Sequence, residues 1–204
     1  MEIARGAEAI LIKEGNKLIK KRLSKNYRIK EIDSKLIKSR TRQEARLLEK
    51  LKDEIKVPNI LNVDEKNNVI EMEFIEGKKL SEHFDSLNKK EQNKVWRLIG
   101  KEVALMHNEN VIHGDLTTSN MILKDDQVYL IDFGLGYVND KVEPKAVDLH
   151  LLTQAFESKH YKYFEDSVKI IFKEYKKYIK DSENIFERLT KFEKMGRYKI
   201  KKKQ

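Results

Sequence analysis

Three polar side chains lie close together in the sequence and could do chemistry on a phosphate group. The stretch "HGDLTTSNMIL", residues 113 to 123, carries Asp115 and Asn120, and "YLIDFGLG", residues 129 to 136, carries Asp132. Phosphoryl transfer needs its charge neutralised, its metal held and its acceptor aligned. The oxygens of Asn120 and Asp132 suit Mg²⁺, and the carboxylate of Asp115 could orient a hydroxyl and accept its proton. Taken alone, Asp115 is more typical of a turn residue, so the hypothesis depends on the set.

The order and spacing of the three residues match the protein-kinase signature. That signature also requires a lysine on the third N-terminal strand, paired with a glutamate on a helix. The segment "KLIK" ends in Lys20, which is the natural candidate, and Glu44 is its expected partner. The alternative for Lys20 is a solvated strand-end lysine beside Lys21.

Glu44 stands out independently, from helical periodicity. Residues 34–55 lack glycine and proline and predict a long helix, on which one face carries Ile37, Thr41, Glu44, Leu48 and Leu51. A carboxylate that faces a core needs a cation or several hydrogen bonds. The alternative is a stripe centred on Leu47 and Leu48, with Glu44 at its wet edge.

The remaining elements predict a sheet-rich first part and a mostly helical second part. The segments "EAILIK" and "KLIKKR" flank a turn and predict a hairpin. A strand follows in "NVIEMEFIEG", then a helix over 88–110, the strands "NMIL" and "VYLID" around a polar turn, and more helix from about Ala146. We therefore expect an α+β fold with residues 1–75 as a first lobe, 76–193 as a second lobe and 194–204 as a basic tail.

Composition narrows the class of protein. The 204 residues suit one domain or two small lobes around a cleft. The absence of cysteine excludes disulfides and thiolate metal sites. No apolar run approaches the roughly 20 residues needed to span a bilayer, so we expect a cytoplasmic protein without membrane contact. A net charge of +9 favours polyanionic partners, although a Lys- and Glu-rich surface like that of thermophilic proteins gives the same composition.

The kinase pattern also assigns roles near the joint between the two parts. "EMEFIEG" resembles a kinase hinge, with Met72 as gatekeeper and the backbone of Glu73 and Ile75 meeting the adenine. His113 is expected to support the catalytic loop rather than to transfer protons.

A more specific resemblance covers almost the whole chain. The segments "RGAEAILIK", "KKRLSKNYR", "RTRQEARLL", "VIHGDLTTSNMIL", "IDFGLG" and "KAVDLHLL" occur in order. They are similar to the small atypical kinase and ATPase subunit of the KEOPS complex, which takes part in making threonylcarbamoyladenosine in tRNA. The resemblance implies a minimal bilobed kinase fold, ATP and Mg²⁺ as cofactors, and the threonylcarbamoyl-transferase subunit, other KEOPS subunits and tRNA as partners.

The resemblance also implies roles for individual residues. Lys20, Glu44, Asp115, Asn120 and Asp132 would handle ATP and Mg²⁺. Asp148 in "AVDLH" would brace the catalytic loop, although an acid favoured by a helix dipole is as good a reading.

Departures from ordinary kinases point to weak selection of protein substrates. The phosphate-covering loop, Gly6, Ala7, Glu8 and Ala9, has one glycine, and Glu8 adds negative charge. Gly114 replaces the arginine that anchors a phosphorylated activation segment. Thr117 replaces a common γ-phosphate lysine, and the segment before "AVDL" is too short for a peptide platform.

Alternatives remain at this level. A small-molecule phosphotransferase of the aminoglycoside or choline kinase type shares the motif but needs a larger acceptor-binding region, and a RIO-type kinase usually lacks Asp-Phe-Gly. A non-catalytic tRNA-binding scaffold is the third alternative. It is supported by a basic tail, expected to be flexible, that contains Arg197, Lys199, Lys201, Lys202 and Lys203.

Overall fold

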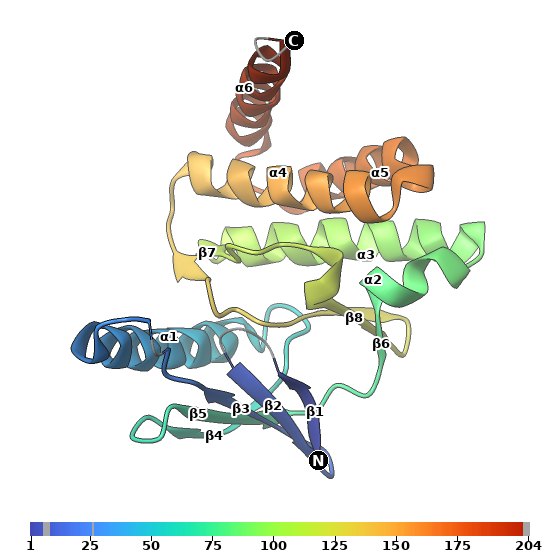
Figure 1. Cartoon of the computed structure of the whole chain (residues 1–204). Coiled ribbons are helices and arrows are strands. Elements are labelled where there is room, and N and C mark those ends of the chain that lie inside the picture. Colours follow the sequence, from blue (N-terminus) through green and yellow to red (C-terminus); the bar gives the residue numbers. More distant parts are fainter. Residues whose placement is uncertain (6–8, 26, 202–204) are drawn as a thin grey trace.

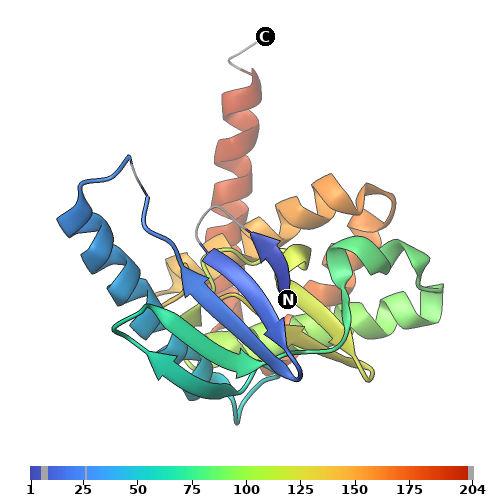
Figure 2. The same ribbon diagram turned by 60° about the horizontal axis from the view of Figure 1, so that its bottom comes forward.

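The computed structural model describes residues 1–5, 9–25 and 27–201, without the side chains of Arg5, Glu193 and 195–201. An antiparallel sheet with one long helix forms one end of the molecule, and a stack of helices forms the other (Figure 1). The last helix projects from this stack, as the rotated view also shows (Figure 2). The sheet-plus-helix part followed by a helical part agrees with the predicted α+β fold.

The N-terminal sheet places Lys20 near its middle. Its strand order is β1-β2-β3-β5-β4, and all pairs are antiparallel. The predicted hairpin is present, closed by Gly15 at φ 58°, a left-handed conformation that glycine adopts without strain. Lys20 lies opposite Ile70 of the neighbouring strand. The strands are β1 Glu2–Arg5, β2 Ala9–Glu14, β3 Lys17–Arg22, β4 Ile60–Asp64 and β5 Val69–Glu73.

Helix α1 (Lys30–Leu51) carries the predicted buried stripe. Glu44 is 1% exposed, so the alternative that left it at a wet edge is wrong. The helix begins and ends four residues earlier than predicted. Asp33 accepts hydrogen bonds from the Ser24 hydroxyl and the Lys25 N–H, which fixes the first turn. At the other end, the chain turns after Leu51 so that Ile55 is buried.

The second part is built on α3 (Lys89–Asn108), close to the predicted bounds. Asn88 and Glu91 form a reciprocal capping box at its start. The predicted hairpin of "NMIL" and "VYLID" is β8 and β9, and its turn residues Asp125 and Asp126 both have positive φ. The other elements are β6 Lys78–Lys79, α2 Leu80–His83, η1 Phe84–Ser86, β7 Val111–Ile112, η2 Thr118–Asn120, β8 Met121–Lys124, β9 Gln127–Leu130, β10 Tyr137–Val138, α4 Val142–Lys159, η3 Tyr161–Tyr163, α5 Phe164–Tyr178 and α6 Ser182–Lys201.

A continuous hydrophobic core joins the two parts. It runs from α1 through α3 to α4 and α5, and its largest fully buried side chains include Trp96, Phe84 and Phe156. The segment after β7, residues 113–117, which is the predicted catalytic loop, lies on this core through Leu116, which is fully buried. Within the described residues, no helix combines the length and apolar character that crossing a bilayer requires.

The C-terminal segment from residue 194, predicted to be a flexible tail, has a helical backbone as far as Lys201, and its flexibility remains a prediction. Helix α6 continues without interruption to Lys201, because the segment contains no proline and is rich in helix-forming residues. Arg197, Lys199 and Lys201 thus lie on a helical backbone, and Lys202 and Lys203 lie outside the described residues. The division at residue 75 remains a prediction.

Candidate active site

The catalytic loop brings Asp115 and Asn120 together between β7 and β8. The Asn120 side-chain amide donates to both the backbone oxygen and the carboxylate Oδ2 of Asp115, each at 2.9 Å. The amide nitrogen is therefore used inside the loop, and the Asn120 Oδ1 atom is the one suited to a metal. Asp115 is exposed, as a residue that meets an incoming hydroxyl must be.

Asp132 adopts a conformation that is rare for a side-chain-bearing residue. Its φ is 62°, in the left-handed region that aspartate tolerates better than most residues. Its Oδ1 atom accepts from Lys20 Nζ at 2.7 Å and from the Gly134 N–H at 3.2 Å. Partial desolvation at the wall of the cleft acts against ionisation, but the Lys20 ammonium and these hydrogen bonds hold the pKa of Asp132 below its usual value. Asp132 is therefore a carboxylate at neutral pH.

Lys20 bridges the predicted helix glutamate and Asp132. Its Nζ atom lies 2.6 Å from Glu44 Oε1 and 2.7 Å from Asp132 Oδ1. Its side chain is 7% exposed, so the alternative of a solvated strand-end lysine is wrong. Burial lowers the pKa of Lys20, but the Glu44 and Asp132 carboxylates outweigh it and raise the pKa overall. The ammonium thus stays charged at the wall of the cleft.

Arg22 completes this cluster, and the sequence analysis gave it no role. Its Nη2 atom lies 2.6 Å from the second carboxylate oxygen of Glu44, and its side chain is 4% exposed. A side chain at Gly134 would approach this guanidinium to 2.9 Å, so Arg22 also packs against the segment after Asp132. The signal available was strand periodicity, because residues two apart on a strand face the same side.

A cavity of about 290 Å³ adjoins the cluster. Met72, Glu73 and Ile75, the predicted adenine contacts, line one side. The other side is polar and is lined by Lys20, Glu44, Ser119, Asn120 and Asp132. Ala9 is buried at the start of β2, whereas Gly6, Ala7 and Glu8 lie outside the described residues.

Asp148 of α4 holds the backbone of the catalytic loop. Its two carboxylate oxygens accept from the N–H groups of His113 at 2.6 Å and Gly114 at 3.0 Å. Gly114 has φ 77°, and a Cβ atom there would lie 2.5 Å from the Leu135 oxygen. A residue with a side chain does not fit here. Steric constraint therefore explains why glycine occupies the position that is arginine in ordinary kinases.

His113 is buried behind the loop. Its Nε2 atom lies 3.1 Å from the Ile131 oxygen, and its Nδ1 atom accepts from the Asp115 N–H at 3.3 Å. Burial lowers the pKa of His113 despite the neighbouring carboxylates. The ring is therefore neutral, with its proton on Nε2, and links the segments before Asp115 and Asp132.

Two residues that the sequence analysis missed extend this support into the helices. His107 Nε2 lies 3.3 Å from Asp148 Oδ2, and His107 Nδ1 lies 2.7 Å from the Tyr175 hydroxyl. Burial, together with the Asp148 charge, raises the pKa of Tyr175, so its hydroxyl keeps its proton and pairs with His107 Nδ1. No local pattern marks this pair, because the two residues are 68 positions apart.

The donor set fits magnesium bound together with a nucleotide. Asp132 and Asn120 supply hard oxygen ligands at the cavity, and Mg²⁺ usually combines one or two such protein ligands with phosphate oxygens and water. Within the described residues, no group of three or more His, Cys, Asp or Glu could hold a metal by itself. A metal here would therefore need the phosphates.

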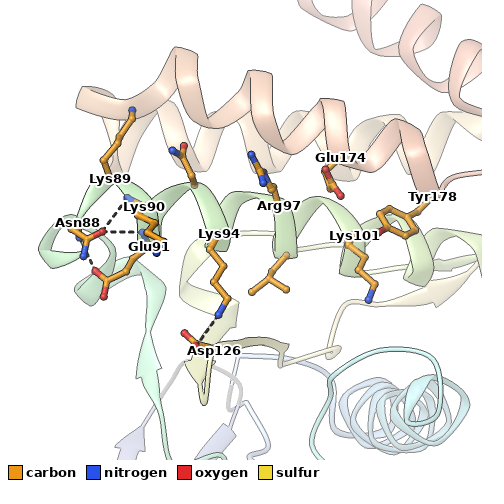
Figure 3. Close-up of a pocket in the computed structure, with 12 residues that line it drawn as sticks. Asn88, Lys89, Lys90, Glu91, Lys94, Arg97, Lys101, Asp126, Glu174 and Tyr178 are labelled. Carbon is orange, nitrogen blue, oxygen red and sulfur yellow. Dashed lines mark hydrogen bonds and ion pairs between the residues drawn. The ribbon is translucent and has the colours of Figure 1, made fainter.

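A larger surface groove lies away from this chemistry. It has a volume of about 1,090 Å³ and follows α3, between the β8–β9 turn and α5 (Figure 3). Charged residues dominate it, and Lys94 forms an ion pair with Asp126 at 2.8 Å. The smaller, more enclosed cavity beside Lys20 has the mixed apolar and polar lining that a nucleotide needs.

Comparisons with known proteins show which family the chain belongs to. A family model for the RIO domain matches residues 13–185. The KEOPS complex subunit Bud32 of Pyrococcus abyssi is 44% identical over 185 residues, which cover 89% of this chain and 84% of that protein. A probable bifunctional tRNA threonylcarbamoyladenosine biosynthesis protein of Methanobrevibacter smithii is 41% identical over 205 residues, covering 96% of this chain but only 36% of that longer protein.

Solved structures extend the likeness at the level of the fold. The Rio2 kinase of Chaetomium thermophilum, solved as an ADP/Mg²⁺–phosphoaspartate complex, has a TM-score of 0.62 at 13% identity, over 82% of this chain and 59% of that one. The Asp-Phe-Gly segment, which the sequence analysis used to set RIO-type kinases apart, does not separate this chain from them. The chain belongs to the RIO-domain family and, within it, to the family of the KEOPS subunit Bud32.

Proposed function

We propose that the chain binds Mg²⁺–ATP and acts as an atypical serine/threonine protein kinase, chiefly an autokinase and ATPase, that supports threonylcarbamoyladenosine formation in tRNA. The observation that carries the proposal is Lys20, held between Glu44 and Asp132 at the wall of a cavity that Asn120 also lines. Family membership supports the same reading.

The residues divide the work of phosphoryl transfer. Lys20 would exchange the Asp132 carboxylate for phosphate oxygens, which frees Asp132 to join Asn120 in holding Mg²⁺. Bound Mg²⁺ would neutralise charge on the phosphates. Asp115 would orient the acceptor oxygen and take its proton as the bond from that oxygen to the γ-phosphorus forms and the bond to the leaving ADP oxygen breaks.

The acceptor and the partners belong to the proposal as well. Between Asp132 and α4 the chain has only the short strand β10, so a peptide platform would have to come from elsewhere. We infer that the output of the site is regulation of a cytoplasmic assembly with the threonylcarbamoyl-transferase subunit, other KEOPS subunits and tRNA. The bifunctional relatives support that inference, because they are named for tRNA threonylcarbamoyladenosine biosynthesis and contain a stretch similar to this chain.

Reconstitution tests the proposal directly. Release of phosphate from ATP would be measured for the chain alone, with the purified transferase subunit, and with that subunit plus tRNA. We expect hydrolysis to depend on the partner, and both hydrolysis and tRNA modification to be lost in Asp115→Ala and Asp132→Ala.

Two outcomes would overturn parts of it. Efficient phosphorylation of added proteins, insensitive to the partner, would contradict the regulatory role. Normal tRNA modification by the Asp115→Ala variant would favour the non-catalytic scaffold, the alternative supported by the basic residues near the C-terminus.

A further inference from the structure

A second groove lies on the outer side of α1, opposite the face that carries Glu44. It has a volume of about 650 Å³, and α1 forms one wall while Tyr137 and Val138 of β10 form the other. Four of its lining residues are basic, and none of the described residues that line it is acidic. The basic residues are Lys35, Lys38, Arg42 and Arg46.

These four side chains form one stripe along the helix. They are spaced by three, four and four residues, which places them on one face over a length of roughly 16 Å. All four are exposed. Arg42 forms an ion pair with Glu65 at 2.5 Å, but no described residue forms an ion pair with Lys35, Lys38 or Arg46.

The electrostatic field of the stripe extends beyond the groove. A hydrogen bond from Arg42, followed by the charges of Arg42, Lys38 and Arg46, lowers the pKa of Glu65. The groove along α3 is different, because acidic Glu91, Asp126 and Glu174 line it together with its lysines. The α1 groove is thus the more favourable of the two for a polyanion.

The opposite wall supplies an aromatic surface. The side chain of Tyr137 is 37% exposed at the groove, where its ring offers a face on which an unpaired base can stack. The apolar lining beside Tyr137 is limited to Leu47, which is only 2% exposed, and Val138, which is 59% exposed. A protein interface normally needs a dehydrated apolar centre, whereas exposed cations beside one aromatic ring suit a nucleic-acid strand.

We propose that the α1 groove binds the phosphate backbone of an RNA strand, with Tyr137 stacking on a base. This inference deepens the proposed function, since it names where RNA would contact the chain. Gln43 connects the groove to the candidate active site. Its side-chain amide donates to the Gly136 oxygen at 2.5 Å, and it directly precedes Glu44.

Two charge-matched variants of the full chain test the site. The first carries Lys35→Gln, Lys38→Gln and Arg46→Gln in the α1 groove. The control carries Lys90→Gln, Lys94→Gln and Arg97→Gln in the α3 groove, which is the same loss of two lysines and one arginine. Fluorescence anisotropy would measure binding of an unmodified tRNA transcript over a range of salt concentrations, with thermal unfolding as the check on folding.

We expect the α1 variant to bind tRNA at least tenfold more weakly, and the slope of log affinity against log salt to fall by about two, since each phosphate contact contributes roughly 0.7 to 0.9. The control should stay within about threefold of the wild type. Tyr137→Ala should weaken binding at least fivefold, and Tyr137→Phe should restore it because stacking needs only the ring.

Three outcomes would overturn the inference. Equal losses of tRNA affinity in both charge variants would indicate that only the net positive charge of the chain attracts tRNA. Unchanged tRNA affinity in the α1 variant would exclude the α1 groove as the binding site. Intact tRNA binding with lost binding to the purified transferase subunit would make the groove a protein interface. Titration with ADP and Mg²⁺ separates this result from the proposed function: a wild-type chain that fails to bind ADP refutes the nucleotide site without affecting the RNA result.

Discussion

Two buried polar networks support the candidate site, and they are built differently. The cluster of Lys20, Arg22, Glu44 and Asp132 joins the sheet to α1 through charges of both signs. The network of Asp148, His107, His113 and Tyr175 contains one carboxylate, which accepts from two backbone N–H groups and lies beside the His107 ring. Charged pairs can exchange partners when a ligand arrives, whereas a saturated hydrogen-bond network keeps one geometry.

Exposure follows the same division. Asp132 is the accessible member of the charged cluster, with its side chain 52% exposed. Asp148 and His107 are fully buried. We infer that the charged cluster binds the phosphates and changes its ion pairs when it does so. The second network holds the loop that carries Asp115 in one conformation.

The largest expected effect is at Asp115, the group that the fixed network positions. Asp115→Asn should lower ATP hydrolysis by about 10²- to 10⁴-fold, because the amide cannot accept the acceptor's proton. Stability should be unchanged because Asp115 is exposed. Asp125→Asn, an exposed aspartate in the β8–β9 turn, is the matched control and should keep full activity. Equal activity of the two variants in a phosphate-release assay would contradict the assignment.

The charged cluster should respond next most strongly. Arg22→Met leaves the buried Glu44 with Lys20 alone, and loss of one partner of a buried pair costs about 3 kcal/mol in the free energy of unfolding. The site also gains one net negative charge, so KM for ATP should rise more than kcat falls. The control is Lys17→Met on the same strand, where a partly exposed pair with Glu71 contributes about 1 kcal/mol or less.

Arg22→Lys sharpens this prediction. It keeps the charge, so KM for ATP should return most of the way to the wild-type value even if stability recovers only in part. An unchanged KM in Arg22→Met, measured by initial rates, would limit Arg22 to a structural role.

The second network should show the opposite pattern. Tyr175→Phe removes the hydroxyl that is hydrogen-bonded to His107 and should cost about 1–2 kcal/mol in urea unfolding, because the buried ring nitrogen loses its partner. KM for ATP should not change. Tyr178→Phe, in which the partly exposed ring beside Lys101 is kept, is the control and should be neutral. A raised KM in Tyr175→Phe would break the distinction between the networks.

The smallest expected effect is the pH dependence from His113. Burial lowers its pKa in the folded chain below the ordinary histidine value of about 6.5, so below about pH 6.5 the unfolded state binds the proton more readily. His113 therefore stabilises the fold above that pH, and this contribution is lost as the pH falls. Urea midpoints between pH 7.5 and 5 should fall less steeply for His113→Gln than for the wild type. A steeper fall would mean that the folded chain protonates His113.

The sequence predicted the parts of the site that local pattern or known chemistry determines. Lys20 and Glu44 were paired because strand position and helix periodicity indicated the same interaction. Asp148 could be placed by resemblance, whereas Arg22 became visible only when β3 packed on α1. His107 and Tyr175 could not be paired, since packing of α3 against α5 creates their contact. The bounds of α1 differ from the predicted ones because Asp33 is hydrogen-bonded to Ser24 and Lys25 at the start of the helix, and Ile55 turns into the core beyond its end.

Helix α1 presents two functional faces of one rigid body. Residues two apart on an α-helix differ by about 200° around its axis, so Arg46 in the groove and Glu44 in the cluster point in nearly opposite directions. Rotation of α1 about its axis therefore displaces the basic stripe and the Glu44 side chain in opposite directions. A ligand that clamps the stripe would restrict the angular freedom of Glu44, and a nucleotide that fixes Lys20 would in turn stiffen the groove.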